Sequence, residues 1–456
     1  MYFYRTGKTQ KQRISPLAVE AKAENFPTLQ PSNPIKMNKR SFIKSLAALP
    51  LTTPITLSAM DQVVNSFSHI PINELAADED FWALIRGGYK LKPDYINLEN
   101  GYYCFLPQET LENFISHVRE VNYQGSFYMR TKAADDKKLA IERLAKVAGC
   151  SPEELGITRN TTESLDTVIS GFDWKKGDET VMAEQDYFSM LAMFKQVSIR
   201  YGVVNKMVSV PNHPANDEEI VNLYANAISP KTKLLMVSHM VNITGQILPV
   251  RKICDMAHSK GVQVLVDGAH AFAHIQFSIP DLHCDYYGAS LHKWLSVPLG
   301  AGLLYVKKEH IPSIWPLLAP GEKALDDIGR LNHTGTHPVH TLLALQNAID
   351  YYEKVGAERK EERLRYLQNY WTGKVRGLQH VVLNTPADPA RSCGIANVGI
   401  KGMKPQGLAD MLLKKYKIYT VAIDGANVQG CRITPNIYTT TKELDVFVAA
   451  LKEMEV

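Results

Sequence analysis

The chain has 456 residues, 45% of them hydrophobic and 21% charged, and 51 basic against 47 acidic residues give a formal net charge of +4. This composition is that of an ordinary globular protein, long enough for two or three domains and a large buried core. No basic stripe interleaved with aromatic residues is present, which argues against a nucleic-acid-binding protein.

Residues 1–60 are predicted to form a leader separate from the globular part. The basic run Met37–Lys44 precedes the short apolar run Ser45–Leu51, which is the pattern of a secretory signal. The basic run is similar to a twin-arginine signal with lysine in place of the first arginine. We therefore expect a true start at Met37 and export to the periplasm, with a cytoplasmic tail as the alternative. Pro50 interrupts the apolar run, which is too short to span a bilayer, so no stable membrane insertion is expected.

From residue 61 onward, short apolar strands alternate with helices, which indicates an α/β fold with a mostly parallel sheet. The expected strands are Gly156–Arg159, Thr180–Ala183, Lys233–Ser238, Val262–Val266, Asp285–Gly288 and Gly302–Val306. The expected helices are Asp135–Ala148, Thr162–Ser170, Tyr187–Arg200, Asp217–Ala227 and Val250–Ser259.

The last third of the chain has a different pattern. Two long helical stretches, His340–Val355 and Ala357–Gly377, are followed by short strands and one more helix. We expect a large domain over residues 61–335, with its N-terminal segment partly joining a smaller α+β domain over residues 336–456.

Two of the predicted strands end in side chains that suit pyridoxal phosphate chemistry. The strand Val262–Val266 is followed by Asp267, and the apolar run Cys284–Ala289 leads to Lys293. A lysine can form a Schiff base with the aldehyde of this cofactor. A carboxylate can pair with the pyridine nitrogen and keep the ring an electron sink.

Three other strand ends carry weaker signals. The segment Thr158–Ser164 joins a strand to a helix, where backbone N–H groups and hydroxyls bind phosphate, although threonine and asparagine are also ordinary helix caps. Tyr187 could stack on a cofactor ring or only pack in the core. Asn242 could reach a cofactor or substrate, or serve as a turn residue beside Gly245.

The segments TTES, QDY, SHMVNITG, VDGAH, SLHKW and GTH follow one another in the order found in the class V aminotransferase family of fold-type I pyridoxal phosphate enzymes. The chain resembles this family from about Asn97 to Thr440. The family includes cysteine desulfurases, kynureninases, serine–glyoxylate-type aminotransferases and isopenicillin N epimerases. The resemblance implies a large domain with a mostly parallel seven-stranded sheet, a small C-terminal α+β domain and a homodimer with shared active sites.

The resemblance also implies a role for each matching residue. Lys293 would carry the cofactor and shuttle the Cα proton, while Asp267 would pair with the ring nitrogen. Arg432 would grip the substrate α-carboxylate with a bidentate guanidinium. The remaining cofactor contacts would be His270 at the phenolic oxygen, Tyr187 on the ring face, Asn242, the phosphate ligands Thr161, Thr162, Ser290 and His292, and Thr336 toward the phosphate of the neighbouring subunit.

A metal centre is not predicted. The six scattered cysteines form no C-x-x-C pair, and most are expected to be small core residues. His333, His337 and His340 have helical spacing, but Gly335 and Pro338 interrupt them; the other pair with such spacing is His270 and His274.

The choice within the family rests on two segments. Cysteine desulfurases carry a nucleophilic cysteine ahead of the carboxylate-binding arginine, but Ile418–Asn427 has none, and Cys431 is expected on the opposite strand face from Arg432. The segment around Lys293 looks most like isopenicillin N epimerases. We therefore expect an amino-acid epimerase or an aminotransferase. A cysteine desulfurase or lyase, and a non-catalytic cofactor-binding protein, are the alternatives.

Overall fold

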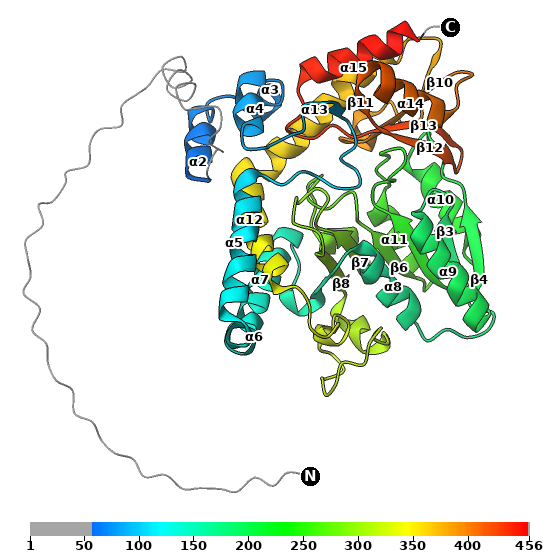
Figure 1. Cartoon of the computed structure of the whole chain (residues 1–456). Helices are drawn as coiled ribbons and strands as arrows, with labels where there is room; N and C mark the ends of the chain where they lie inside the picture. Colours follow the sequence, from blue (N-terminus) through cyan, green and yellow to red (C-terminus); the bar gives the residue numbers. More distant parts are fainter. Residues whose placement is uncertain (1–56, 455–456) are drawn as a thin grey trace, which may run out of the picture. The chain divides into compact units, whose positions relative to one another are not determined.

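A seven-stranded sheet with the order β2-β8-β7-β6-β5-β3-β4 lies at the centre of the large domain. The structure is a computed structural model, and it describes residues 57–454 (Figure 1). Residues 1–56 of the predicted leader, with the proposed start at Met37, lie outside these residues, whereas residues 57–60 begin the helix α2 (Leu57–Ser66). Among residues 57–454, no helix has both the length and the apolar character that a bilayer crossing requires.

The strand directions place several chain segments at one edge of this sheet. The strand β8 is antiparallel to both neighbours, and all other pairs are parallel, which confirms the mostly parallel sheet. Strands β2, β7, β6, β5 and β3 therefore end at the same edge, where β8 begins. The strands are β2 (Leu155–Thr158), β3 (Glu179–Ala183), β4 (Val204–Val208), β5 (Thr232–Ser238), β6 (Gln263–Asp267), β7 (Tyr286–Ser290) and β8 (Gly302–Val306).

Helices between the strands cover the sheet. Their bounds are α8 (Thr161–Gly171), α9 (Phe188–Tyr201), α10 (Asp217–Ala227) and α11 (Val250–His258). One apolar core joins Leu165 of α8 and Phe194 of α9 to Leu265 of β6 and Leu304 of β8. These helices match the predicted ones to within a residue or two.

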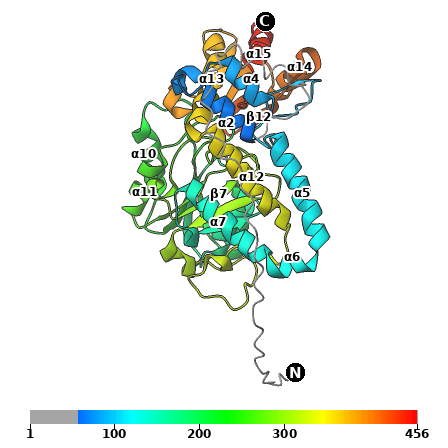
Figure 2. The ribbon, with the colours of Figure 1, turned by 90° about the vertical axis from the view of Figure 1, so that its left-hand side faces the viewer.

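Several elements were not predicted from the sequence. They include α2 (Leu57–Ser66), α3 (Ile72–Leu75), α5 (Gln108–Gln124), α6 (Ser126–Thr131) and the edge strand β4. The long helix α12 (Val339–Val355) packs beside α5 and α7 (Ala133–Ala148), as Figure 2 shows. Helix α5 lacks a clear apolar face in the sequence, because Thr110 is its one buried residue.

The C-terminal part has a second, antiparallel sheet with the order β12-β13-β10-β9. Trp371, Leu412 and Phe447 lie in the core between this sheet and three helices, which confirms the α+β prediction. The elements are β9 (Val381–Leu383), β10 (Ala396–Ile400), β12 (Val421–Gly425), β13 (Val428–Ile433), α13 (Ala357–Val375), α14 (Pro405–Tyr416) and α15 (Thr441–Glu453).

An early segment of the chain contributes to this part of the molecule. The short strand β1 (Ile96–Asn97) pairs in parallel with β11 (Ile418–Tyr419). Three further helices precede it: α2 (Leu57–Ser66), α3 (Ile72–Leu75) and α4 (Glu79–Arg86). The predicted domain boundary between residues 335 and 336 stays a prediction.

Candidate active site

Several of the predicted site residues lie at the edge where the parallel strands end. Asp267 is the last residue of β6 and is paired with Gly288 of β7, which itself ends at Ser290. Ser290 is paired with Gly302, the first residue of β8. Ligands of open α/β sheets bind outside the carboxyl ends of the strands, so the candidate site has the expected position.

Lys293 follows β7 and is held by a histidine. Its Nζ lies 2.9 Å from His270 Nε2, and the Trp294 indole N–H donates to His270 Nδ1 at 3.4 Å. With Nδ1 accepting, the neutral imidazole carries its proton on Nε2, facing the amine. Burial lowers the pKa of Lys293 to about 8, although the Asp267 carboxylate acts to raise it. A lysine of this kind has more neutral, nucleophilic amine at neutral pH than an exposed one.

His270 is uncharged in this environment. Burial, with the positive charges of Lys293 and Arg432, lowers the pKa of His270 well below its usual value. A neutral imidazole can both accept and donate, so His270 can orient the amine without adding a charge to the site.

Asp267 is buried beside these groups. The Ala269 N–H donates to Asp267 Oδ1 at 3.0 Å, and burial raises the pKa of the carboxyl. The next residue must be glycine, because a Cβ on Gly268 would lie 1.9 Å from Tyr287 Cζ. Burial disfavours the charged carboxylate, so a cationic ligand atom at Asp267 would stabilise it.

The N-terminus of α8 and the end of β7 form a polar cradle. The Thr161 N–H donates to Ser290 Oγ at 2.8 Å, and the hydroxyls of the two residues lie 2.7 Å apart. Asn160 caps the helix by accepting the Glu163 N–H at 2.9 Å. Gly302 permits this close approach, since a Cβ there would lie 2.7 Å from Asn160 Cα. Such a helix end with its hydroxyls favours an anion.

His292 adds an unsatisfied polar atom to this region. Its Nδ1 is buried and has no hydrogen-bond partner among residues 57–454. Burial lowers the pKa of His292 to about 4, so the ring is neutral. Thr162, the second predicted phosphate ligand on α8, is half-buried. An orphaned ring nitrogen is explained if a bound group supplies its partner.

Three predicted residues are not brought into direct contact with Lys293 or Asp267. Tyr187 is half-buried at the N-cap of α9, with its ring centroid 4.5 Å from that of Phe188. Asn242 contributes its backbone oxygen, which accepts from Arg432 Nη1 at 3.3 Å. Thr336 is exposed in the loop before α12. The roles predicted for these side chains stay predictions.

Arg432 already has an internal partner, which the sequence did not reveal. Its Nε donates to Glu99 Oε2 at 3.2 Å and its Nη2 to Glu99 Oε1 at 2.5 Å. Gly101 packs against the guanidinium so closely that a Cβ there would lie 2.7 Å from Arg432 Cζ. No local pattern could have found Glu99, because 333 positions separate it from Arg432.

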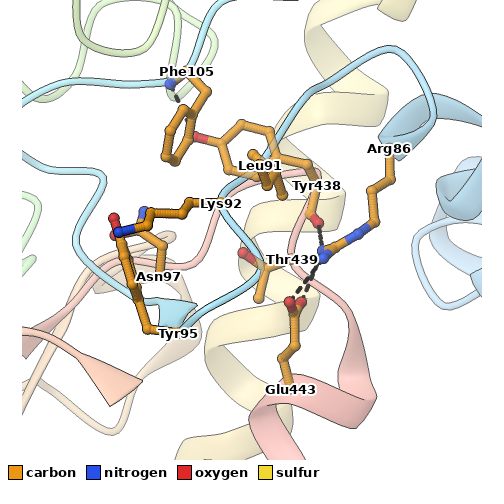
Figure 3. A pocket seen from close by; sticks show the side chains of 9 residues that line it. All are labelled: Arg86, Leu91, Lys92, Tyr95, Asn97, Phe105, Tyr438, Thr439 and Glu443. Carbon is orange, nitrogen blue, oxygen red and sulfur yellow. Dashed lines mark hydrogen bonds and ion pairs between the residues drawn. The ribbon is translucent and has the colours of Figure 1, made fainter. Parts of the chain in front are cut away.

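A separate small pocket lies next to the chain segment that carries Glu99 (Figure 3). In it, the Arg86 guanidinium forms two bonds of 2.8 Å with Glu443. Tyr438 on its wall donates to Asn100 Oδ1 at 2.7 Å and accepts from the Phe105 N–H at 3.2 Å. Internal pairs satisfy these polar groups, and none of the predicted site residues lines this pocket.

The cysteines do not supply an activated thiol. Five of the six are buried, as predicted, and Cys431 faces the core, with its thiol 3.6 Å from the Pro405 oxygen, away from Arg432. Cys104 lies near Lys293, but burial raises its pKa to about 12. A thiol with this pKa is protonated at neutral pH and is a poor nucleophile. Among residues 57–454, no three His, Cys, Asp or Glu side chains are placed to hold a metal ion.

The polar groups of the candidate site fit pyridoxal phosphate. The cradle of Thr161, Ser290 and the α8 N-terminus suits the phosphate, Asp267 suits the ring nitrogen, and Lys293 has an amine with a lowered pKa. The orphaned His292 Nδ1 is a further polar atom that such a ligand would satisfy.

Comparison with known proteins gives the same family. Residues 107–447 match the family model of class V aminotransferases. The isopenicillin N epimerase of Amycolatopsis lactamdurans is 29% identical over 392 residues, covering 82% of this chain and 98% of the relative. A probable cysteine desulfurase of Halalkalibacterium halodurans is 27% identical over 318 residues, covering 67% of this chain and 76% of the relative.

Solved structures share the fold. The apo cysteine desulfurase of Thermococcus onnurineus has a TM-score of 0.72 at 22% identity, covering 83% of this chain and 98% of that one. A mutant of C-DES with glycine covalently linked to its pyridoxal phosphate has a TM-score of 0.71 at 22% identity. The match covers 79% of this chain and 96% of that one. The architecture is that of the fold-type I pyridoxal phosphate enzymes, and the chain belongs to the class V aminotransferase family.

Proposed function

We propose that the protein is a pyridoxal-phosphate-dependent enzyme that acts at the Cα of an amino-acid substrate, as an epimerase or as an aminotransferase. The observation that carries this proposal is the Lys293 amine, buried 2.9 Å from His270 with its pKa lowered to about 8. The similarity to isopenicillin N epimerases, at 29% and 26% identity over four-fifths of the chain, supports the epimerase branch.

The chain's own residues would divide the work. The cofactor, when bound, supplies the electron sink for the bond cleaved at Cα. Lys293 takes and returns the Cα proton, and His270 fixes the position of its Nζ. Asp267 holds the ring nitrogen, while Thr161 and Ser290 hold the phosphate. Arg432 faces the substrate carboxyl group.

The epimerase and aminotransferase activities differ in the fate of the proton. Lys293 can serve one face of Cα, and epimerisation also requires a proton donor on the other face. Incubating a panel of L-amino acids in heavy water, with and without a keto acid, separates the two. Deuterium at Cα with D-isomer formation supports an epimerase, and keto-acid-dependent amino transfer supports an aminotransferase.

A desulfurase or lyase is the less favoured alternative. The buried Cys431 faces away from Arg432, and Cys104 has a pKa raised to about 12, so neither thiol is suited to attack sulfur. Release of sulfide or persulfide from cysteine in the same panel would favour this alternative.

Substitution of the lysine tests the proposal as a whole. Lys293→Ala should remove the visible absorbance of the bound cofactor and lower activity by at least about 1,000-fold. Lys360→Met is the matched control, because Lys360 is also buried with a pKa lowered to about 8. The control should keep the absorbance. A wild-type protein that stays colourless with added pyridoxal phosphate would refute the proposal.

We also propose a homodimer with shared active sites. Thr336 is exposed, and the neighbouring Thr334 and His337 line a pocket with Thr158 near the start of α8. An exposed position is what a residue requires if it is to reach the phosphate of a second copy. Light scattering should give twice the mass of one chain; a monomer that binds cofactor and turns over substrate would contradict this.

A further inference from the structure

The carboxylate-binding arginine is neutralised by a residue of the same chain. Glu99 meets Arg432 along the side of the guanidinium, through Nε and Nη2. The two side chains are only 9% and 6% exposed, for Arg432 and Glu99 respectively. Water therefore screens this pair far less than an ion pair on the surface.

The glutamate is fixed in this position by its backbone. Glu99 forms a parallel bridge with Thr434, two residues beyond Arg432, and the Thr434 N–H donates to the Leu98 oxygen at 2.8 Å. The Tyr102 N–H donates to Glu99 Oε1 at 2.9 Å. Backbone pairing therefore holds Glu99 beside the strand that carries Arg432, and the ion pair has a fixed geometry.

The pair leaves a defined part of the guanidinium for a substrate. Of the five N–H groups of Arg432, two donate to Glu99 and one donates to the Asn242 oxygen at 3.3 Å. Within residues 57–454, one N–H on Nη1 and one on Nη2 therefore have no acceptor. A substrate carboxylate can use these two, but it then meets a guanidinium whose charge is already offset.

The charge count decides which substrates this arrangement favours. A bound α-carboxylate places two carboxylates on one buried arginine, and like charges in a weakly screened site repel. An amine without a carboxylate on its reacting carbon leaves the Glu99–Arg432 pair intact. The ion pair thus reduces the binding free energy that a substrate would otherwise gain from its α-carboxylate.

We propose that Glu99 is a specificity-determining residue: by neutralising Arg432, it admits amines whose reacting carbon bears no carboxylate, alongside α-amino acids. This inference rests on the proposed function, since the amine must react at the Lys293 site. The opposite role, in which Glu99 only orients Arg432 to bind carboxylates better, predicts the opposite sign of the effect.

Glu99→Gln separates charge from orientation. A glutamine keeps an oxygen that can accept from the guanidinium, but it carries no charge. Glu99→Asp is the second variant, because it keeps the charge and shortens the side chain. Glu361→Gln is the matched control: Glu361 pairs side-on with Arg365 at 2.7 and 2.9 Å, outside the site.

Three substrate pairs that differ only in the carboxylate measure the preference: L-alanine and ethylamine, L-leucine and 3-methylbutylamine, L-phenylalanine and 2-phenylethylamine. Affinities are read from the change in cofactor absorbance of the holoenzyme on mixing. Glu99→Gln should shift the preference toward the amino acid by about tenfold or more. Glu361→Gln and Glu99→Asp should stay within about twofold of the wild type.

A second measurement does not depend on the cofactor. Calorimetric titration of the cofactor-free protein with 3-phenylpropionate should show about tenfold tighter binding for Glu99→Gln than for the wild type. Unchanged or weaker binding in the Gln variant, with an unchanged preference among the pairs, would overturn the proposal and leave Glu99 an orienting residue. If the wild type fails to bind pyridoxal phosphate at all, the proposed function fails, and this titration still decides the role of Glu99.

Discussion

Two buried aspartates lie at opposite ends of neighbouring strands in the seven-stranded sheet, and their electrostatic surroundings differ. Asp267, at the end of β6, accepts a backbone hydrogen bond from the Ala269 N–H at 3.0 Å, and burial raises its pKa. Asp285, just before β7, accepts from His258 Nε2 at 2.8 Å, His310 Nε2 at 3.0 Å and the Val264 N–H at 2.7 Å.

The partners of Asp285 reverse the effect of burial. Burial acts to raise its pKa, but the hydrogen bonds from His310, His258 and Val264 outweigh it, and the pKa is lowered. Asp285 is therefore a satisfied structural group, and Asp267 is an incompletely paired one. A buried carboxylate that its own chain leaves short of donors is therefore a candidate ligand contact, whereas a fully paired one is structural.

Of the two aspartate substitutions, Asp267→Asn should have the larger effect on activity. We expect kcat/KM to fall by about 1,000-fold, because the amide cannot supply the negative charge that pairs with a ring nitrogen. The folded-state pKa is raised, so the stability that this group contributes is present at low pH and is lost as the pH rises through that pKa. Burial of this carboxyl therefore costs the cofactor-free protein stability as the pH rises, and Asp267→Asn should not lower the thermal midpoint.

If cofactor-free Asp267→Asn has a lower thermal midpoint than the wild type, the proposed difference between Asp267 and Asp285 is wrong. Such a result would show that Asp267, like Asp285, stabilises the fold. Circular dichroism of the variant and wild-type proteins at pH 7 makes the comparison.

Asp285→Asn should lower the stability of the fold and leave the activity nearly unchanged. Loss of charge-assisted bonds to His258 and His310 should lower the free energy of unfolding by about 2 kcal/mol. The kcat/KM of the folded variant should stay within about twofold of the wild type, because Asp285 lies at the edge away from Lys293. Denaturant titration and steady-state kinetics on the same preparation test both parts.

The stability effect of Asp285→Asn should depend on pH in the acid range. A lowered pKa means that the contribution of Asp285 is present above the ordinary aspartate value of 3.8 and is lost as the pH falls through the folded-state value. The stability difference between wild type and variant should therefore shrink below about pH 3.8. A difference that stays constant into strong acid would show that packing, and not the charge, is the cause.

The smallest expected effect is a change in the titration of Lys293. Uptake of pyridoxal phosphate by the cofactor-free protein should speed up with pH around a midpoint near 8, because the neutral amine is the reactive form. The Asp267 carboxylate raises the pKa of Lys293, so Asp267→Asn should move this midpoint to lower pH. Asp285→Asn should not move it. Stopped-flow absorbance over a pH series measures the midpoints, and equal shifts in both variants would refute a local charge effect.

Much of the fold was predictable because its signals are local. The strand Gly302–Val306 and the helix Asp217–Ala227 have the predicted bounds, since apolar runs and acidic first turns mark them directly. The edge strand β4 was missed because it is partly exposed and carries Asn205 and Lys206, which break the apolar pattern.

The amino-acid sequence alone was enough to predict the candidate residues: a lysine and an aspartate after two apolar strands, and hydroxyls at a helix start. Their pairing became visible in the folded structure. It placed His270 on Lys293 and Glu99 on Arg432. Strand patterns are encoded over a few residues, whereas burial and ion pairing depend on segments far apart in the chain. Burial lowers the pKa of Lys293, and Glu99 offsets the charge of Arg432.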